Sequence, residues 1–156
     1  MPRAALIAVL AAAVFASAAQ AKTITFSVTS VSISIKPTDL KPKGTSNGDT
    51  IVYRNRLLNT ARRFGRPKGA VVGSDHGTLT FTGAHTARYS GTAVLPDGTV
   101  RLAGSVTPLA NGMLQFRVAG GTGRYAKATG KVIVGSGNAR ALNTYQLTLP
   151  GGGNIA

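Results

Sequence analysis

The sequence contains no cysteine, no tryptophan and no glutamate. The absence of cysteine excludes disulfide bonds, thiolate metal sites and cysteine nucleophiles. The absence of glutamate excludes catalysis by that side chain, so every acidic residue is an aspartate: Asp39, Asp49, Asp75 and Asp97. Without tryptophan, an aromatic binding surface must be built from phenylalanine and tyrosine.

Basic residues are abundant by contrast. Eighteen Lys and Arg against four acidic residues give a formal net charge of +14 over 156 residues. A hydrophobic content of 43% is enough for a packed core, which predicts one folded domain rather than a disordered chain. Twenty glycines, together with many Thr, Val and Ser residues, favour strands over helices.

The first 21 residues have the pattern of a secretory signal peptide. Arg3 precedes an apolar run from Ala4 to Ala18, and Ala19-Gln20-Ala21 has the small-x-small form of a cleavage site. The run is shorter than the roughly 20 residues of a membrane-spanning helix, and no other run approaches that length. We therefore expect a secreted protein, extracellular or periplasmic, whose mature residues 22–156 form one domain without a membrane span.

Apolar and polar residues alternate with a period of two along the mature chain, which predicts strands. The alternation slips at Thr29-Ser30, which indicates either one bulged strand or two short ones. Asp97-Gly98 and Asn111-Gly112 are typical hairpin turns. Further strands are expected near residues 51–57, 78–82, 87–95, 100–106, 114–118, 132–134 and 145–149. The basic stretch 59–69 is expected to be an exposed, mobile loop.

About eight short antiparallel strands fold either as a two-sheet sandwich or as a closed barrel. A barrel removes exposed strand edges, and Gly73, Gly83, Gly91 and Gly104 lie where its wall would bend. We therefore expect an all-β, eight-stranded antiparallel barrel. The interior of such a barrel is either filled by side chains or wide enough for one small ligand.

Residues 116–130, FRVAGGTGRYAKATG, resemble the signature of dirigent proteins, in which a strand ends in Gly-Gly-Thr-Gly before an aromatic residue and a glycine turn. Tyr89-Ser90-Gly91-Thr92-Ala93, with Phe81-Thr82-Gly83 before it, is similar to another strand of that family. Dirigent proteins share the allene oxide cyclase barrel, so the resemblance implies an eight-stranded antiparallel barrel with a ligand cavity. The consecutive glycines allow positive φ and close backbone approach, so Tyr125 can fold back as a plug.

The resemblance also implies a function. Dirigent proteins steer the coupling of phenoxy radicals, allene oxide cyclases close an unstable fatty-acid epoxide, and both hold a mostly apolar ligand inside the barrel. Their catalytic residues do not carry over, because Arg124 stands where a dirigent protein can have an acidic residue and glutamate is absent. Family members are often dimers or trimers, which implies a homo-oligomer.

The candidate site residues follow from this barrel. Asp49 and Asp75 are the candidate catalytic carboxylates, because the hairpin already explains Asp97. The candidate ligand-binding residues are Tyr53, Phe81, Tyr89, Phe116, Arg124 and Tyr145. Ser74-Asp75-His76 is a poor hydrolase triad, because neighbours in a strand point to opposite faces. His76 and His85 are too few for a metal site, so neither a metal nor another cofactor is expected.

The sequence is compatible with three functions of different classes. The first is a barrel that binds an apolar or phenolic molecule and either has no catalytic role or guides the reaction of that molecule by orientation. The second is a cofactor-free isomerase or cyclase. The third is binding of an anionic envelope polymer through the six cations between Arg54 and Lys68. Predicted export and the lack of a recognisable binding module argue against nucleic acid as the partner.

Overall fold

The computed structural model describes residues 20–40, 43–135, 137 and 139–151. The predicted signal peptide therefore lies almost wholly outside the described residues. The strands are β1 (Lys22–Thr38), β2 (Thr50–Asn59), β3 (Val71–Gly83), β4 (Thr86–Leu95), β5 (Gly98–Ser105), β6 (Thr107–Pro108), β7 (Leu114–Gly121), β8 (Thr129–Val134) and β9 (Arg140–Leu149). Two 3₁₀ turns complete the fold: η1 (Ala110–Gly112) and η2 (Gly123–Tyr125). Within the described residues, no helix has the length and apolar character needed to cross a membrane.

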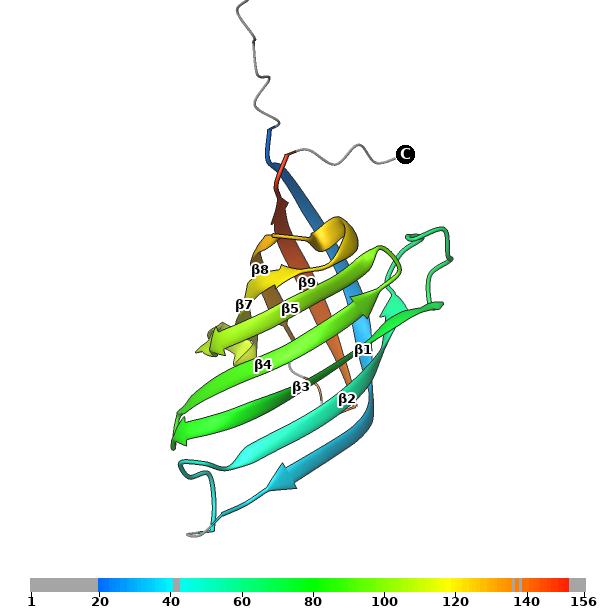
Figure 1. Cartoon of the computed structure of the whole chain (residues 1–156). Helices are drawn as coiled ribbons and strands as arrows, with labels where there is room; N and C mark the ends of the chain where they lie inside the picture. Colours follow the sequence, from blue (N-terminus) through cyan, green and yellow to red (C-terminus); the bar gives the residue numbers. More distant parts are fainter. Residues whose placement is uncertain (1–19, 41–42, 136, 138, 152–156) are drawn as a thin grey trace, which may run out of the picture.

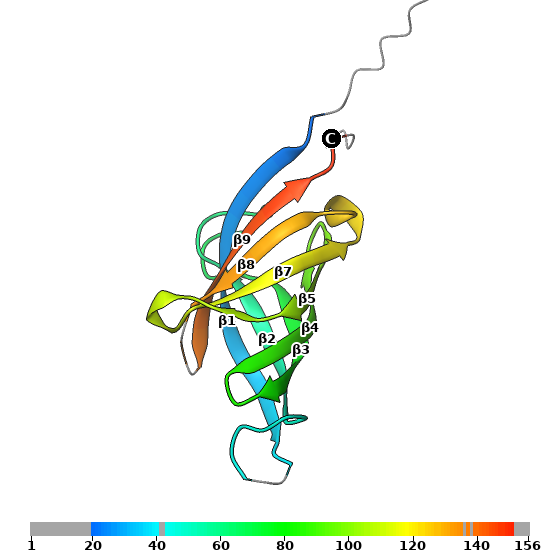
Figure 2. The same cartoon turned by 90° about the vertical axis from the view of Figure 1, so that its left-hand side faces the viewer.

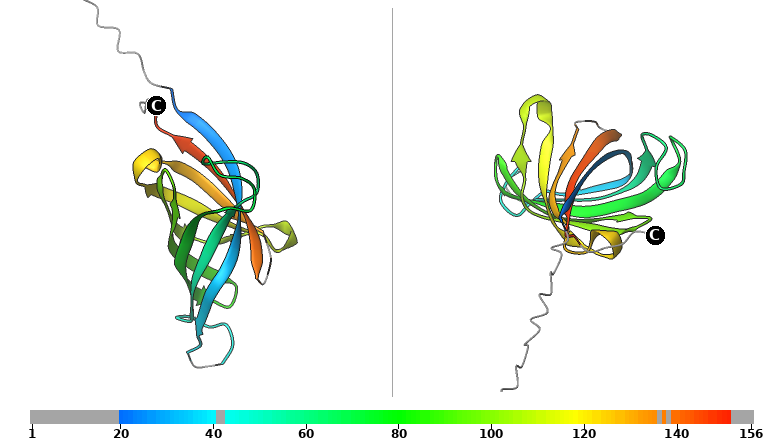
Figure 3. Two further views of the ribbon diagram at one scale, coloured as in Figure 1. Left: turned by 90° about the vertical axis from the view of Figure 1, so that its right-hand side faces the viewer. Right: turned by 90° about the horizontal axis from the view of Figure 1, so that it is seen from above.

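The eight long strands close into an antiparallel barrel, as predicted (Figure 1). They are hydrogen-bonded in the order β5-β4-β3-β2-β1-β9-β8-β7, and pairing between β5 and β7 closes the ring. That seam is narrow, with Val100 opposite Gly121 and Leu102 opposite Val118. β1 and β9, the first and last strands, lie side by side (Figure 2). The strands wrap around a common axis when the molecule is seen from above (Figure 3).

Inward-pointing side chains fill one half of the barrel. Phe26 and Tyr145 stack with ring centroids 4.8 Å apart, and Val28, Leu57 and Leu147 are completely buried beside them. Tyr125 is 1% exposed, which confirms the prediction that it folds back as a plug. Burial of these rings and aliphatic chains is the main source of stability.

The Gly-Gly-Thr-Gly turn shows both expected properties, positive φ and close backbone approach, but at different glycines. Gly120 and Gly123 have φ of +103° and +57°, which favours glycine. Gly121 does not adopt positive φ, so conformational freedom is not what requires glycine at this position. A Cβ there would instead overlap the backbone oxygen of Thr99 across the seam. Close approach of two strands is therefore what requires glycine at this position.

β1 is one long bulged strand, but its bulge is not at Thr29-Ser30. The register with β2 shifts between Ser32 and Ser34. Ser30 is 5% exposed and points inward, whereas Ile33 is 54% exposed. The predicted slip is present but lies further along the strand, at Ser32–Ser34, because the inward positions Ser30 and Ser32 are polar and hide where the alternation changes.

The loop between β2 and β3 is exposed over most of its length, as predicted, but specific contacts tie it to the barrel, so the structure does not support the predicted mobility. The buried Asn59 amide donates to the backbone oxygens of Arg63, at 2.8 Å, and Arg66, at 3.1 Å. Phe64 packs edge-on against Phe26 with centroids 5.8 Å apart, and the Arg63 guanidinium lies 4.5 Å from the Phe26 ring. The loop therefore covers the filled half of the barrel.

Candidate functional site

A cavity of about 380 Å³ lies inside the barrel, next to its filled half. Its apolar lining comes from strands all around the ring and includes Ile51, Leu79, Leu102, Leu114, Phe116, Val132 and Val134. Ile35, which is 53% exposed, and the exposed Arg140 also line it, so the cavity reaches the surface near β1 and β9. A pocket of this size and lining suits one small organic molecule.

A polar cluster interrupts the apolar lining. Asp75 of β3 is 6% exposed, and its Oδ2 accepts a hydrogen bond from Asn143 Nδ2 of β9 at 3.4 Å. The Asn143 Oδ1 in turn accepts one from the Ser30 hydroxyl at 3.4 Å. The second carboxylate oxygen of Asp75 is buried without a hydrogen-bond partner among the described residues. A buried acceptor without a donor is costly, so this oxygen is an unsatisfied polar atom in the lining of the cavity.

Two tyrosines form a second polar group in the cavity. The hydroxyls of Tyr53 and Tyr89 are hydrogen-bonded, and their rings lie 6.0 Å apart between centroids at 17°. Gly77 and Gly91 are cross-strand partners beneath them, and a Cβ at either would collide with the Tyr89 hydroxyl. Because neither glycine has a Cβ, the Tyr89 phenol can lie flat against the inner surface of β3 and β4.

Burial changes the acidity of these groups. Desolvation raises the pKa of Asp75 to about 6, although the Asn55 amide and His76 act in the opposite direction. Desolvation likewise raises the pKa of Tyr89 to about 12. The pKa of Tyr53 is raised for the same reason, so the tyrosines stay neutral hydrogen-bonding groups at neutral pH while Asp75 can exchange its proton.

Most of the predicted site residues meet in this cavity. Tyr53, Tyr89, Phe116 and Tyr145 all line it, and so does the predicted catalytic candidate Asp75. Sequence reasoning missed the polar residues Ser30, Asn55 and Asn143. The signal for Asn143 is its place in the alternation of β9, two residues before the inward-pointing Tyr145.

Three predicted residues do not line the cavity. Phe81 lies beyond it near the end of β3. Arg124 pairs with Asp97 on the rim, with Nη1 3.3 Å from Oδ2. Asp49 accepts hydrogen bonds from the backbone N–H groups of Leu40 and Ser46, both at 2.7 Å.

These contacts give Asp49 another role. The hydrogen bonds from Leu40 and Ser46 lower the pKa of its carboxyl group. The low pKa of Asp49 and its position outside the cavity indicate that this residue stabilises the loop between β1 and β2. The prediction of Asp49 as a candidate catalytic carboxylate is therefore corrected by the structure.

The basic stretch from Arg54 to Lys68 does not form one free patch. Arg63 packs on Phe26, and Arg66 Nη1 donates to the backbone oxygen of Val71 at 2.8 Å. Binding of a polyanion through this stretch stays a prediction. Among the described residues, no group of three or more His, Asp, Glu or Cys side chains is placed to hold a metal ion.

The fold and the enclosed pocket define a closed antiparallel barrel with one interior site. The family described as allene oxide cyclase barrel like domain matches residues 29–141, which is well over half of the chain. The chain belongs to this family, and the predicted resemblance is confirmed. No curated protein matches the sequence.

Several solved structures share the fold. A pyocyanin demethylase is 22% identical with a TM-score of 0.67, over 80% of this chain and 100% of that one. A pterocarpan synthase dirigent protein is 14% identical with a TM-score of 0.64, over 88% and 90% of the two chains. The Diels Alderase AbmU from Streptomyces koyangensis is 24% identical with a TM-score of 0.62, over 83% of this chain and 64% of that one. At these identities the similarity establishes the fold.

Proposed function

We propose that the barrel binds a small, mostly apolar molecule that carries a hydrogen-bond donor, such as a phenol, and holds it in one orientation. The observation that supports this is the buried oxygen of Asp75, for which the described residues supply no hydrogen-bond donor, in a cavity otherwise lined mainly by apolar side chains. A donor on the ligand would satisfy that oxygen, while the rest of the molecule would contact the aliphatic and aromatic walls. The fold is consistent with this proposal, since its structural neighbours include a demethylase, a dirigent protein and a Diels Alderase.

Two probes that differ by one hydroxyl test the proposal. We expect 4-ethylphenol to bind about tenfold more tightly than ethylbenzene in isothermal titration calorimetry, because a satisfied buried acceptor contributes about 1–2 kcal/mol. Asp75→Asn and Tyr89→Phe should reduce this preference. Tyr125→Phe is the matched control, because Tyr125 is buried outside the cavity.

The outcomes are distinguishable. Equal affinity for the two probes would refute recognition by the polar cluster. An equal loss of preference in Tyr125→Phe would show that the variants act through stability rather than through the site. Absence of saturable binding by either probe would refute the cavity as a binding site for molecules of this class.

A second function, a cofactor-free isomerase or cyclase, is favoured by the acidity of Asp75. A carboxyl group with a pKa of about 6 can take up and return a proton near neutral pH, as general acid-base catalysis requires. The paired hydroxyls of Tyr53 and Tyr89 lie in the same cavity and can orient a substrate oxygen. No cofactor is needed for a proton to move within one molecule.

Proton transfer is tested on the molecule that the protein itself carries. Native mass spectrometry of protein purified from its own host identifies a co-purified compound, which is then incubated with the protein in D₂O. Deuterium incorporation at carbon, with a midpoint near pH 6 and loss in Asp75→Asn, is the expected result. Exchange that persists in Asp75→Asn would refute the catalytic role while leaving binding intact.

We also infer that the protein is exported. This rests on the leader predicted at residues 1–21. The start of β1 at Lys22 is compatible with the inference, because removal of the leader leaves every strand intact. The expected amino terminus of the mature protein is Lys22.

A further inference from the structure

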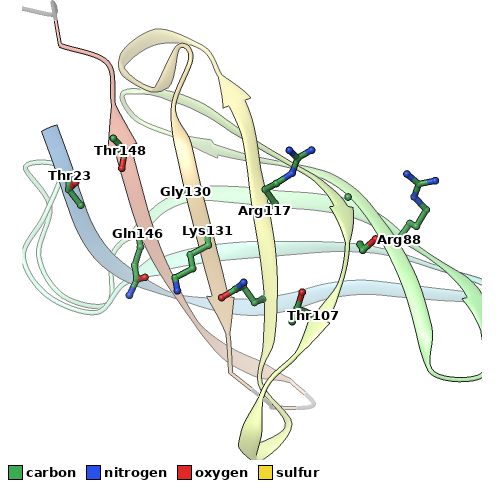
Figure 4. Close-up of a pocket in the computed structure, with 11 residues that line it drawn as sticks. Thr23, Arg88, Thr107, Arg117, Gly130, Lys131, Gln146 and Thr148 are labelled. Atoms are coloured by element: carbon green, nitrogen blue, oxygen red, sulfur yellow. The ribbon is translucent and has the colours of Figure 1, made fainter. Parts of the chain in front are cut away.

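A second hollow of about 830 Å³ lies on the outer wall of the barrel, away from the interior cavity (Figure 4). Its cations come from three strands: Arg88 of β4, Arg117 of β7 and Lys131 of β8. Hydroxyls and amides supply most of the remaining lining, which includes Thr23, Ser105, Thr107, Gln115, Gln146 and Thr148. We name these residues the outer groove.

The cations of the outer groove are brought together by strand register. Arg117 and Lys131 are direct cross-strand partners, and Lys131 is the partner of Gln146 on its other side. The Arg117 side chain extends over β5, because a Cβ at Gly104 would lie 3.7 Å from its Nε. That position brings the guanidinium toward the pair formed by Arg88 and Ser105.

Arg88, Arg117 and Lys131 place three positive charges in one hollow, so they repel one another unless an anion lies nearby. The protein does not supply that anion among the described residues. Asp75 is inside the barrel, Asp49 is held by its loop, and Asp97 pairs with Arg124. Asp39 lies in the β1–β2 connection, outside the groove lining.

We propose that the outer groove binds a carboxylated polysaccharide. The arginines and the lysine match carboxylates, which arginine can bind through two parallel hydrogen bonds. The threonine, serine and glutamine side chains match sugar hydroxyls, since each can donate and accept. Among the described residues, no aromatic side chain lines the groove, so it lacks the stacking surface with which proteins hold single-stranded nucleic acid. This site is separate from the interior cavity, so its test is independent of the proposed function.

The experiment measures binding to polygalacturonate in low salt by biolayer interferometry. The test variant, Arg88→Gln/Arg117→Gln/Lys131→Gln, should bind at least tenfold more weakly than the unmodified protein. The matched control, Arg54→Gln/Arg56→Gln/Arg62→Gln, removes the same charge from exposed positions of the predicted basic stretch. It should change affinity less than threefold. Binding should also weaken as salt is raised, because salt screens exposed charges.

Further probes decide the ligand class. Polyglutamate offers carboxylates without sugar hydroxyls, and duplex and single-stranded DNA offer phosphates. Each should bind more weakly than polygalacturonate, and neutral dextran should not bind. Equal or tighter binding of polyglutamate or DNA would overturn the assignment to a carboxylated polysaccharide, and an equal loss in the control variant would overturn the groove as the site.

A stability measurement separates a binding role from a structural one. Lys131→Gln removes one of the three positive charges of the outer groove, so it should melt at the same or a higher temperature while binding polygalacturonate more weakly. This single variant keeps the test valid if the triple variant fails to fold. A lower melting temperature combined with unchanged affinity would show that Lys131 serves the fold and would overturn the proposal.

Discussion

Asp75→Asn should make the protein more stable at neutral and alkaline pH. In the unfolded chain this carboxyl group has its ordinary pKa of 3.8, whereas burial raises the pKa to about 6 in the fold. Moving the pKa by this amount corresponds to about 3 kcal/mol of unfavourable free energy in the charged form. The amide is nearly the same size, carries no charge and avoids that penalty.

The pH dependence has a definite sign. A carboxyl group with a raised pKa in the fold disfavours folding once it is ionised, so its penalty is absent below about pH 3.8 and complete above about pH 6. The free energy of unfolding of the unmodified protein should therefore fall, relative to Asp75→Asn, as the pH rises through this window. The difference between the two proteins should grow from near zero to about 3 kcal/mol.

Urea unfolding at a series of pH values, followed by far-ultraviolet circular dichroism, measures this difference. Asp49→Asn is the control, because this substitution should change the free energy of unfolding in the opposite direction. Its pKa is lowered by backbone hydrogen bonds, so the ionised carboxyl group supports the fold above pH 3.8 and this support is lost as the pH falls. If Asp75→Asn is no more stable than the unmodified protein at pH 8, the reasoning about the buried carboxylate is refuted.

Two further predictions concern packing. Gly91→Ala would force the Tyr89 hydroxyl from its place, so we expect a loss of about 1–3 kcal/mol in urea unfolding. Gly135→Ala, whose Cβ would have its nearest neighbour at 3.5 Å, should have little effect, and equal losses would contradict the specific role of Gly91. Asn59→Ala removes the amide that anchors the basic loop, so it should lose about 1–3 kcal/mol and be cleaved faster by trypsin after Arg62. Unchanged cleavage would show that the amide does not hold the loop.

The sequence predicts the strands well because the signals for them are local, whereas closure of the barrel depends on the pairing of β5 with β7. Period-two alternation finds the eight long strands, and the Asp97-Gly98 turn joins β4 to β5 as expected. The exceptions have physical causes. Ser30 is a polar residue at an inward position, so it breaks the hydrophobic pattern without breaking the strand.

The site was predicted in part for a related reason. Aromatic residues at inward positions are visible in the alternation, and Tyr53, Tyr89, Phe116 and Tyr145 all line the cavity. Which aspartate lies inside depends on contacts distant in sequence, such as that between Asp75 and Asn143. The charge of the loop after β2 correctly indicated exposure, but it gave no sign of the contacts that fix the loop to the barrel. Its fixed position comes from backbone oxygens that accept bonds from a single buried amide.

The pairing of β1 with β9 has a consequence for how the chain matures. Ten cross-strand pairs join them, from Lys22 opposite Leu149 to Val31 opposite Arg140. The earliest strand to be synthesised therefore keeps one uncovered edge until the last strand has emerged. Such an edge can recruit other copies of the chain, so a molecule truncated before β9 should aggregate rather than persist as an incomplete barrel. The barrel can close only when both β1 and β9 are present, so the chain must be complete before it can fold stably.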